Sequence, residues 1–267
     1  PRETREAGAA DWRNHFGTGP FILKDWVEGS HAIYDRNPNY WDTETINGKE
    51  YPIPFIDQLV FPWILDRSTQ IAALRTGQLD LMPCVEHKYK DSLIATCPDL
   101  MYRPYAIGQA MEIAFMHGTP GGEPGPLPVE PFTDIRVRKA MSMAIDRQAL
   151  LDALYGGEGH MVSWPVSFNY GPLMYTPLEE LPPELAEWHK YDPEAAKQLL
   201  AETAYPNGFK TEMIFRAAGE LERDTASMVV DYWDKHLNIE CELKSMEDTA
   251  LTDTIRSNAY LQLYCGM

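Results

Sequence analysis

The chain is short of positive charge. Its 267 residues include 23 Lys and Arg against 40 Asp and Glu, which gives a formal net charge of −17 at pH 7. Proteins that bind nucleic acids need clustered basic side chains to pair with phosphates, so the composition argues against that class. The chain also lacks an apolar run long enough to cross a bilayer, so no membrane span is expected. An acidic surface of this kind keeps a protein dispersed in water.

Sequence motifs of common catalytic and metal sites are also missing. There is no GxSxG, HExxH or P-loop motif, and none of the seven histidines forms an i, i+4 pair. The four cysteines (Cys84, Cys97, Cys241 and Cys265) form no CxxC motif, so no zinc site is expected. Cys84 and Cys97 could form a disulfide in an exported protein, but two thiols are the favoured interpretation. No cofactor is implied, and a hydrolase or another enzyme on an α/β scaffold stays as the alternative.

The most informative stretch runs from Gly17 to Trp41. Residues 21–27 and 31–36 are rich in aromatic and β-branched side chains, which is typical of strands, and residues 28–30 form a short turn containing glycine. Asn37-Pro38-Asn39 ends the second strand, because proline cannot donate to a sheet. The pattern predicts a β-hairpin, with Tyr40 and Trp41 as core anchors after it. Residues 43–54, with Asn47-Gly48 and two prolines, are expected to form a loop.

This stretch, GTGPF followed by RNPNYW, resembles the signature of the family 5 extracellular solute-binding proteins. These are the peptide, nickel and oligosaccharide receptors of bacterial ABC importers. Three later stretches resemble the family in the same order: ALRTGQLD at 73–80, PFTDIRVRKA to AIDR at 131–147, and YDPEAAKQLL at 191–200. In the last of these, Asp192 is expected to cap a helix and Pro193 to occupy its first turn.

The remaining pattern predicts an α/β protein. A strand at 56–64, a helix capped by Asp66 or Ser68 that ends at Gly77, and a strand at 79–82 form one strand–helix–strand unit. A strand is expected at 111–115, followed by a helix capped by Thr133 or Asp134 and a second helix at 147–155 capped by Asp146. The final third alternates between strands at 211–215, 239–243 and 260–264 and helices at 221–237 and 247–256. This alternation predicts a mainly parallel sheet.

The resemblance implies an α/β fold with the two-lobed, class II periplasmic-binding-protein architecture, incomplete at both ends. Residues 1–105 would form part of the first lobe and residues 106–267 part of the second. The implied function is capture of a solute, with a short peptide favoured and a nickel complex or an oligosaccharide as alternatives. The implied partners are an ABC permease and its ATPase. The protein would be a monomer in the periplasm or outside the cell, with a lipid anchor left open.

The expected ligand-facing residues lie near the last strand. In parallel sheets, ligands sit beyond the carboxyl ends of the strands, which here indicates Cys265, Gly266 and Met267. The resemblance implies that Arg256, at the end of the last helix, reaches the cleft and holds a peptide carboxylate. The alternative for Arg256 is a solvated cation at a helix C-terminus. The family places an aromatic residue where Met267 stands, followed by an Asp that pairs with the ligand's amino terminus.

Overall fold

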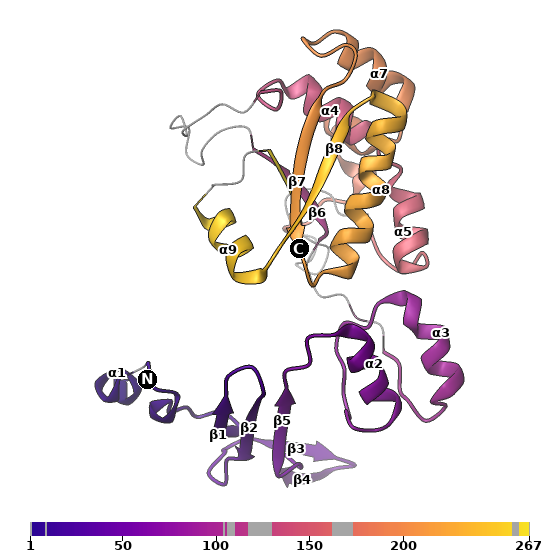
Figure 1. Ribbon diagram of the computed structural model, residues 1–267. Coiled ribbons are helices and arrows are strands. Elements are labelled where there is room, and N and C mark those ends of the chain that lie inside the picture. The colour runs from indigo at the N-terminus through magenta and orange to yellow at the C-terminus, as the bar shows by residue number, and fades with distance from the viewer. Residues whose placement is uncertain are drawn as a thin grey trace. The chain divides into compact units, whose positions relative to one another are not determined.

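The computed structural model describes residues 2–8, 10–103, 105, 110–116, 130–161, 173–257 and 262–266. The chain divides into two compact units, residues 1–80 and 81–267 (Figure 1). The predicted boundary between the lobes lay near residue 105. The assignment of residues to the two lobes stays a prediction.

The first unit is built on the predicted hairpin. Strands β1 (Phe21–Val27) and β2 (His31–Arg36) pair antiparallel, as expected, and β5 (Gln58–Pro62) pairs antiparallel with β2. Asn37 ties the start of β1 to the end of β2, because its side chain donates to the Gly19 carbonyl at 2.8 Å and its backbone N–H donates to the Pro20 carbonyl. Two short helices, α1 (Arg2–Ala7) and η1 (Trp12–Asn14), precede this sheet.

Two expectations for the segment after the hairpin are wrong. Residues 43–52 form a second hairpin instead of a loop, with strands β3 (Thr43–Ile46) and β4 (Lys49–Pro52). Asn47 and Gly48 both have positive φ, which suits the tight turn that two-residue hairpins prefer. Trp41 is 75% exposed and therefore does not anchor a core in this unit.

The predicted helix of the first unit forms, but the strand after it does not. Helix α2 (Arg67–Arg75) is capped by the Asp66 side chain, which accepts from the Thr69 N–H at 2.7 Å. Beyond it the chain turns at Gly77, and the N–H groups of residues 78 and 79 both donate to the Ala73 carbonyl. The Leu79 N–H is therefore used in closing the helix, and residues 79–82 form no strand.

The second unit contains a four-stranded sheet in the order β6-β9-β7-β8 (Figure 1). Its strands are β6 (Glu112–Phe115), β7 (Lys210–Arg216), β8 (Glu240–Met246) and β9 (Leu263–Gly266). Strand β7 is parallel to both β8 and β9, which confirms the expected parallel arrangement, and β9 is antiparallel to β6. Strand β9 starts three residues later than predicted.

The described helices of the second unit are α3 (His87–Thr96), α4 (Ile135–Met143), α5 (Arg147–Tyr155), η3 (Leu178–Glu180), α6 (Pro183–Ala186), η4 (Glu187–His189), α7 (Pro193–Ala201), α8 (Glu220–Leu237) and α9 (Asp248–Arg256). Helix α8 packs on one face of the sheet and α9 on the other. Asp134, Asp146 and Asp192 accept from backbone N–H groups at the starts of α4, α5 and α7, as the sequence predicts.

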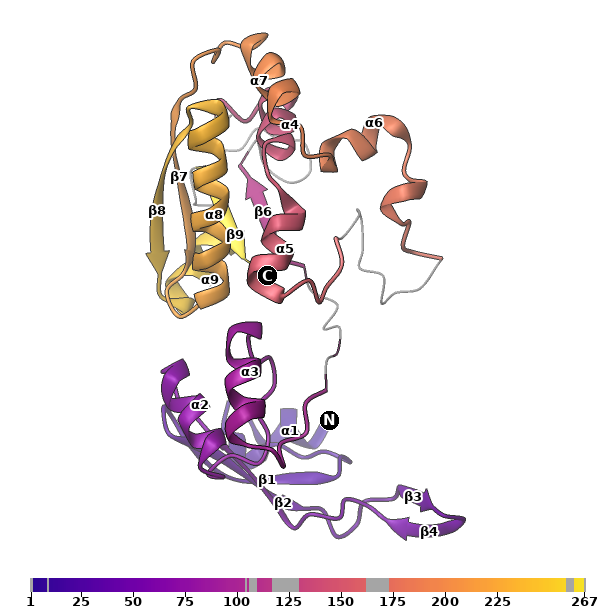
Figure 2. The ribbon, with the colours of Figure 1, turned by 90° about the vertical axis from the view of Figure 1, so that its right-hand side faces the viewer.

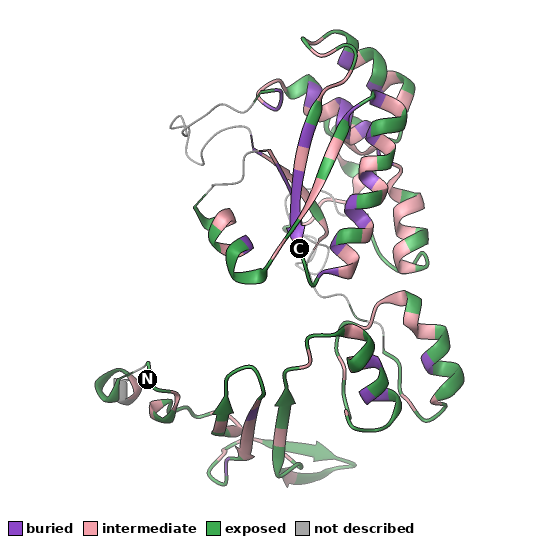
Figure 3. Ribbon diagram, viewed as in Figure 1, coloured by how far each residue is buried: buried purple, intermediate pink, exposed green. Residues whose placement is uncertain are grey.

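Alternating side chains of the strands separate two cores. Met213 and Phe215 of β7 point to the larger core, where α4, α7 and α8 pack, while Ile214 points to a smaller one under α9. Figure 2 shows α8 lying along β7 and β8. The Trp233 indole of α8 is fully buried and donates to the Met141 carbonyl of α4 at 2.9 Å. In Figure 3 the buried residues follow these inner faces.

Candidate functional site at the carboxyl edge of the sheet

The candidate site is the edge of the sheet at which the three parallel strands end. Arg216 is the last residue of β7, Met246 of β8 and Gly266 of β9. The ends of β7 and β8 are joined by a hydrogen bond from the Ala217 N–H to the Met246 carbonyl at 2.8 Å. Helix α8 starts here, after Gly219, and α9 starts here after Glu247. This edge therefore combines strand ends and helix N-termini, the arrangement at which α/β proteins bind ligands.

Tyr264 covers the end of β9. A Cβ atom added to Gly266 would lie 1.8 Å from the Tyr264 hydroxyl oxygen, so the phenol lies directly over this glycine. Tyr264 is only 9% exposed. Burial raises the pKa of its hydroxyl above the ordinary value, and the nearby Arg216 opposes that shift. The phenol is therefore neutral at physiological pH and can donate a hydrogen bond.

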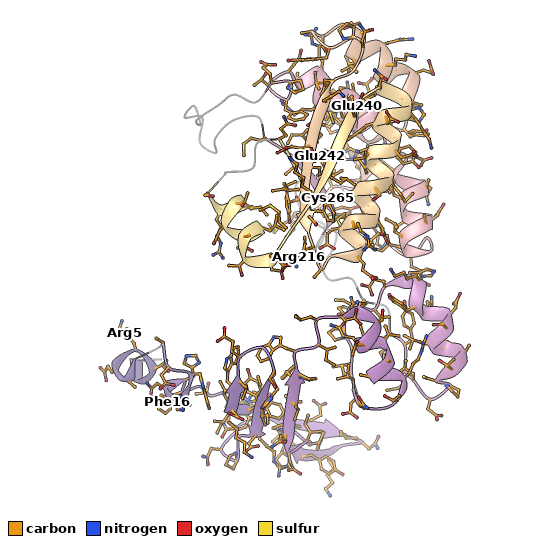
Figure 4. The ribbon with its side chains drawn as sticks, in the orientation of Figure 1. Arg5, Phe16, Arg216, Glu240, Glu242 and Cys265 are labelled. Atoms are coloured by element: carbon orange, nitrogen blue, oxygen red, sulfur yellow. The ribbon has the colours of Figure 1, made fainter. Side chains whose placement is uncertain are left out.

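Charges of both signs meet at this edge. The Arg216 Nε lies 3.0 Å from an Asp248 carboxylate oxygen in the first turn of α9, and this Arg side chain is 43% exposed. On α8, the Glu222 carboxylate packs over Gly219, and the residue is 6% exposed. A guanidinium beside carboxylates can pair with an anionic and a cationic group of one small molecule. Figure 4 shows Arg216 at the lower end of β7 and Cys265 above it.

The structure corrects the expected place of Cys265 and Gly266. Both belong to β9 and do not follow it, and Cys265 pairs with Ile113 of β6 and Phe215 of β7. The Cys265 side chain is fully buried in the larger core, with Sγ 3.6 Å from the Glu222 carbonyl oxygen. Burial raises the pKa of this thiol to about 12, so it is not a reactive group. Met267 lies outside the described residues.

Arg256 lies at the other end of α9 from this edge. Helix α9 starts at Asp248 beside the sheet and ends at Arg256, about 12 Å further along its axis at 1.5 Å per residue. Arg256 is exposed. Within the described ranges it has no hydrogen bond or ion pair with Cys265 or Gly266, so the structure does not bring the predicted residues into one cluster.

Sequence reasoning missed Arg216. The signal was present: a basic residue follows the apolar run Met213-Ile214-Phe215 and precedes Ala-Ala-Gly and a long helix. The rule that placed a site after the last strand applies equally to this strand. The rule was applied only to the end of the last strand, whereas the candidate site includes the ends of β7, β8 and β9.

A hollow lies between β6, α4 and η4. It has a volume of about 320 Å³ and is lined by Ala114, Phe115, Arg138, Ser142 and Trp188. Its polar groups are used in the fold. Arg138 donates to the Phe132 carbonyl, and Ser142 Oγ donates to the Trp188 carbonyl at 2.6 Å. We therefore interpret this hollow as a gap in side-chain packing and not as a binding site.

The described residues hold no cluster of three or more His, Cys, Asp or Glu side chains arranged to bind a metal ion. In the same part of the chain, no helix is long and apolar enough to cross a membrane.

Comparison with known proteins identifies the class and then the family. The fold is that of solute-binding proteins: the E. coli murein tripeptide binding protein MppA superposes with a TM-score of 0.70 at 22% identity, over the whole chain and 48% of its own length. The family model for bacterial extracellular solute-binding proteins, family 5 (middle region), matches residues 2–266. The chain belongs to this family, which is defined by solute binding and not by a catalysed reaction.

Two relatives of this chain are named for different solutes, heme and oligopeptides. Heme-binding protein A of Haemophilus influenzae is 29% identical over 82% of this chain and 36% of its own length. The periplasmic oligopeptide-binding protein OppA of Salmonella typhimurium is 25% identical over 88% of this chain and 40% of its own length. The chain thus spans about two fifths of the length of these relatives.

Proposed function

We propose that the protein containing this chain captures a short peptide at the carboxyl edge of the β6-β9-β7-β8 sheet for import by an ABC permease and its ATPase. The observation that carries the proposal is the mixed charge of this edge. Arg216 suits a peptide carboxylate, and the carboxylates of Asp248 and Glu222 suit an amino group. OppA and other relatives named for peptides support the same assignment.

In this proposal the receptor works as a monomer. It acts outside the cytoplasmic membrane, a location that the description of the family as extracellular supports. A lipid anchor is part of the proposal for the whole protein. Binding proceeds by closure of two lobes around the solute, with no covalent step. Gly266 and Met267 contribute backbone to the cleft wall, and Arg256 contributes its side chain when the lobes close.

The deciding experiment is mass spectrometry of the solute that co-purifies with the full-length protein. A mixture of short peptides is expected. Recovery of heme, an oligosaccharide or a metal complex without peptide would overturn the assignment. Heme must be among the solutes searched for, because one relative is named Heme-binding protein A. A binding protein also returns its ligand intact and gains thermal stability from it, whereas a hydrolase consumes it.

The role of Arg256 is tested by calorimetry on the full-length protein. If Arg256 and not Arg216 holds the peptide carboxylate, Arg256→Ala should weaken binding of trialanine by about 1.5–3 kcal/mol, because a charge-assisted contact is then lost. A loss below about 0.5 kcal/mol with the fold intact would return Arg256 to the role of a solvated helix-end cation. Arg216→Ala in the same titration shows which arginine holds the carboxylate.

A further inference from the structure

Glu222 is a buried carboxylate near the start of helix α8. The residue is only 6% exposed, and its side chain folds back over Gly219, where an added Cβ atom would lie 2.3 Å from a Glu222 oxygen. Burial, and after it the charge of Glu222, raises the pKa of the Tyr155 hydroxyl at the end of α5. Burial also raises the pKa of the Tyr264 hydroxyl, and the charge of Glu222 adds to that shift. Both phenols are therefore neutral at physiological pH, and Glu222 carries the charge of this group of three side chains.

The Glu222 carboxylate is not used in capping its own helix. In a capping box, a glutamate three residues after the N-cap accepts from the N-cap backbone N–H. Here Gly219 is the N-cap, and its N–H donates instead to the Arg216 carbonyl at 3.1 Å. Within the described residues, the Glu222 carboxylate has no hydrogen bond or ion pair. Every Lys and Arg of residues 81–267 lies in the described ranges, so none of them neutralises it.

The neighbouring charges at this edge of the sheet do not balance that carboxylate either. Among the last residues of β7, β8 and β9, Arg216 is the one cation, and it is already paired with Asp248 at 3.0 Å. Glu112, the first residue of β6, pairs with the last residue of β9 and adds a third carboxylate. The edge therefore has more carboxylates than cations. The two ends of a peptide, one ammonium and one carboxylate, do not change this balance.

We infer that the solute is a peptide with a cationic side chain, and that the buried Glu222 carboxylate receives this cation. The inference rests on the proposed function, because it names the class of peptide that the site favours. Burial of a carboxylate without a partner costs free energy, and a cation brought by the solute removes that cost. The positive end of the α8 dipole stabilises the carboxylate while the site holds no solute.

Calorimetry on the full-length protein with matched tripeptides tests this inference. The three tripeptides that contain one lysine and two alanines are compared with the three in which norleucine replaces the lysine. Norleucine has a four-carbon side chain, like the stem of lysine, but no charge. At least one lysine peptide should bind about ten- to a hundred-fold more tightly than its norleucine counterpart, because it gains a charge-assisted contact.

A pair of variants assigns the preference to one side chain. Glu222→Gln keeps the size of the side chain and removes its charge, so it should reduce the preference for lysine to about two-fold or less. Glu220→Gln is the matched control. It lies two residues earlier on the same helix, and its carboxylate is already paired with the Lys88 Nζ at 2.5 Å. The control should keep the full preference for lysine.

The outcomes separate this inference from the proposed function. Equal affinities of the parent protein for lysine and norleucine peptides would overturn the inference and leave the proposed function standing, without any need for a variant. A preference for lysine that persists in Glu222→Gln would overturn the role of Glu222. If none of the six tripeptides binds, the proposed function and this inference both fall.

Discussion

Gly208 occupies a position that no larger residue fits. Its φ is +83°, and an added Cβ would lie 1.9 Å from the backbone carbonyl oxygen of Asn238. The Asn238 side chain in turn donates to the Asn207 carbonyl at 2.6 Å. The turn before β7 is thus locked to the end of α8 by backbone contacts that no rotamer change can relieve.

We expect Gly208→Ala to destabilise the chain by about 2–4 kcal/mol, which combines a left-handed backbone penalty with overpacking. Gly17→Ala is the control, because nothing lies within 4 Å of its added Cβ and no positive φ is required there. Urea denaturation of both variants measures the difference. Equal free energies of unfolding for the two variants would contradict the packing at Gly208.

At the scale of elements, features encoded by neighbouring residues were predictable. Aspartates placed before α2, α4, α5 and α7 cap these helices, and Gly156 ends α5 with φ +60°. Each of these depends on a few adjacent residues, so the sequence contains the whole cause. The β1–β2 hairpin is predictable for the same reason.

Features that depend on distant partners were not predictable. Residues 79–82 have strand-like composition but form no strand, and the N–H of Leu79 bonds back to the Ala73 carbonyl of α2. The end of β9 is set by pairing with β6 and β7, which placed Cys265 inside the sheet. The contacts between Arg216 and Asp248, and between Tyr264 and Gly266, join positions that no local pattern links.

The Asp192 cap gives a prediction for acid stability. Its pKa is lowered from 3.8, first by the hydrogen bond from the Ala195 N–H and then by Lys190. A carboxyl group whose pKa is lower in the folded state stabilises the fold above the unfolded value, and this contribution is lost as the pH falls through the folded pKa. Asp192→Asn keeps a cap acceptor but cannot titrate. The free energy of unfolding of the Asp192→Asn variant should therefore fall less steeply below about pH 4 than that of the parent chain. Parallel acid-denaturation curves followed by circular dichroism would contradict this.

At the scale of the whole molecule, the first unit leaves much apolar surface uncovered. Trp26 and Phe61, which lie on one face of the β1-β2-β5 sheet, are 42% and 54% exposed, and Val60 on the other face is 53% exposed. Contiguous apolar surface on a sheet promotes association. The 267-residue chain on its own should therefore bind a hydrophobic dye and aggregate.

Phe61→Thr should lower dye binding and aggregation, because it removes an exposed ring that packs edge-on against Tyr34. Ile135→Thr, which removes a similarly exposed side chain from the start of α4, should change them much less. Light scattering and dye fluorescence measure both. A monodisperse monomer with a sharp melting transition and no dye signal would disprove the expectation.

The sheet order also governs how the polypeptide acquires its structure during synthesis. Strand β9 is the last of the four to be made, yet it lies between β6 and β7. Its partner β6 leaves the ribosome on the order of 150 residues earlier and has no other neighbour in the described sheet. A nascent chain lacking residues 262–266 therefore cannot close this sheet, however long it waits. Strand β6 therefore has no partner in the described sheet until residues 263–266 have been synthesised.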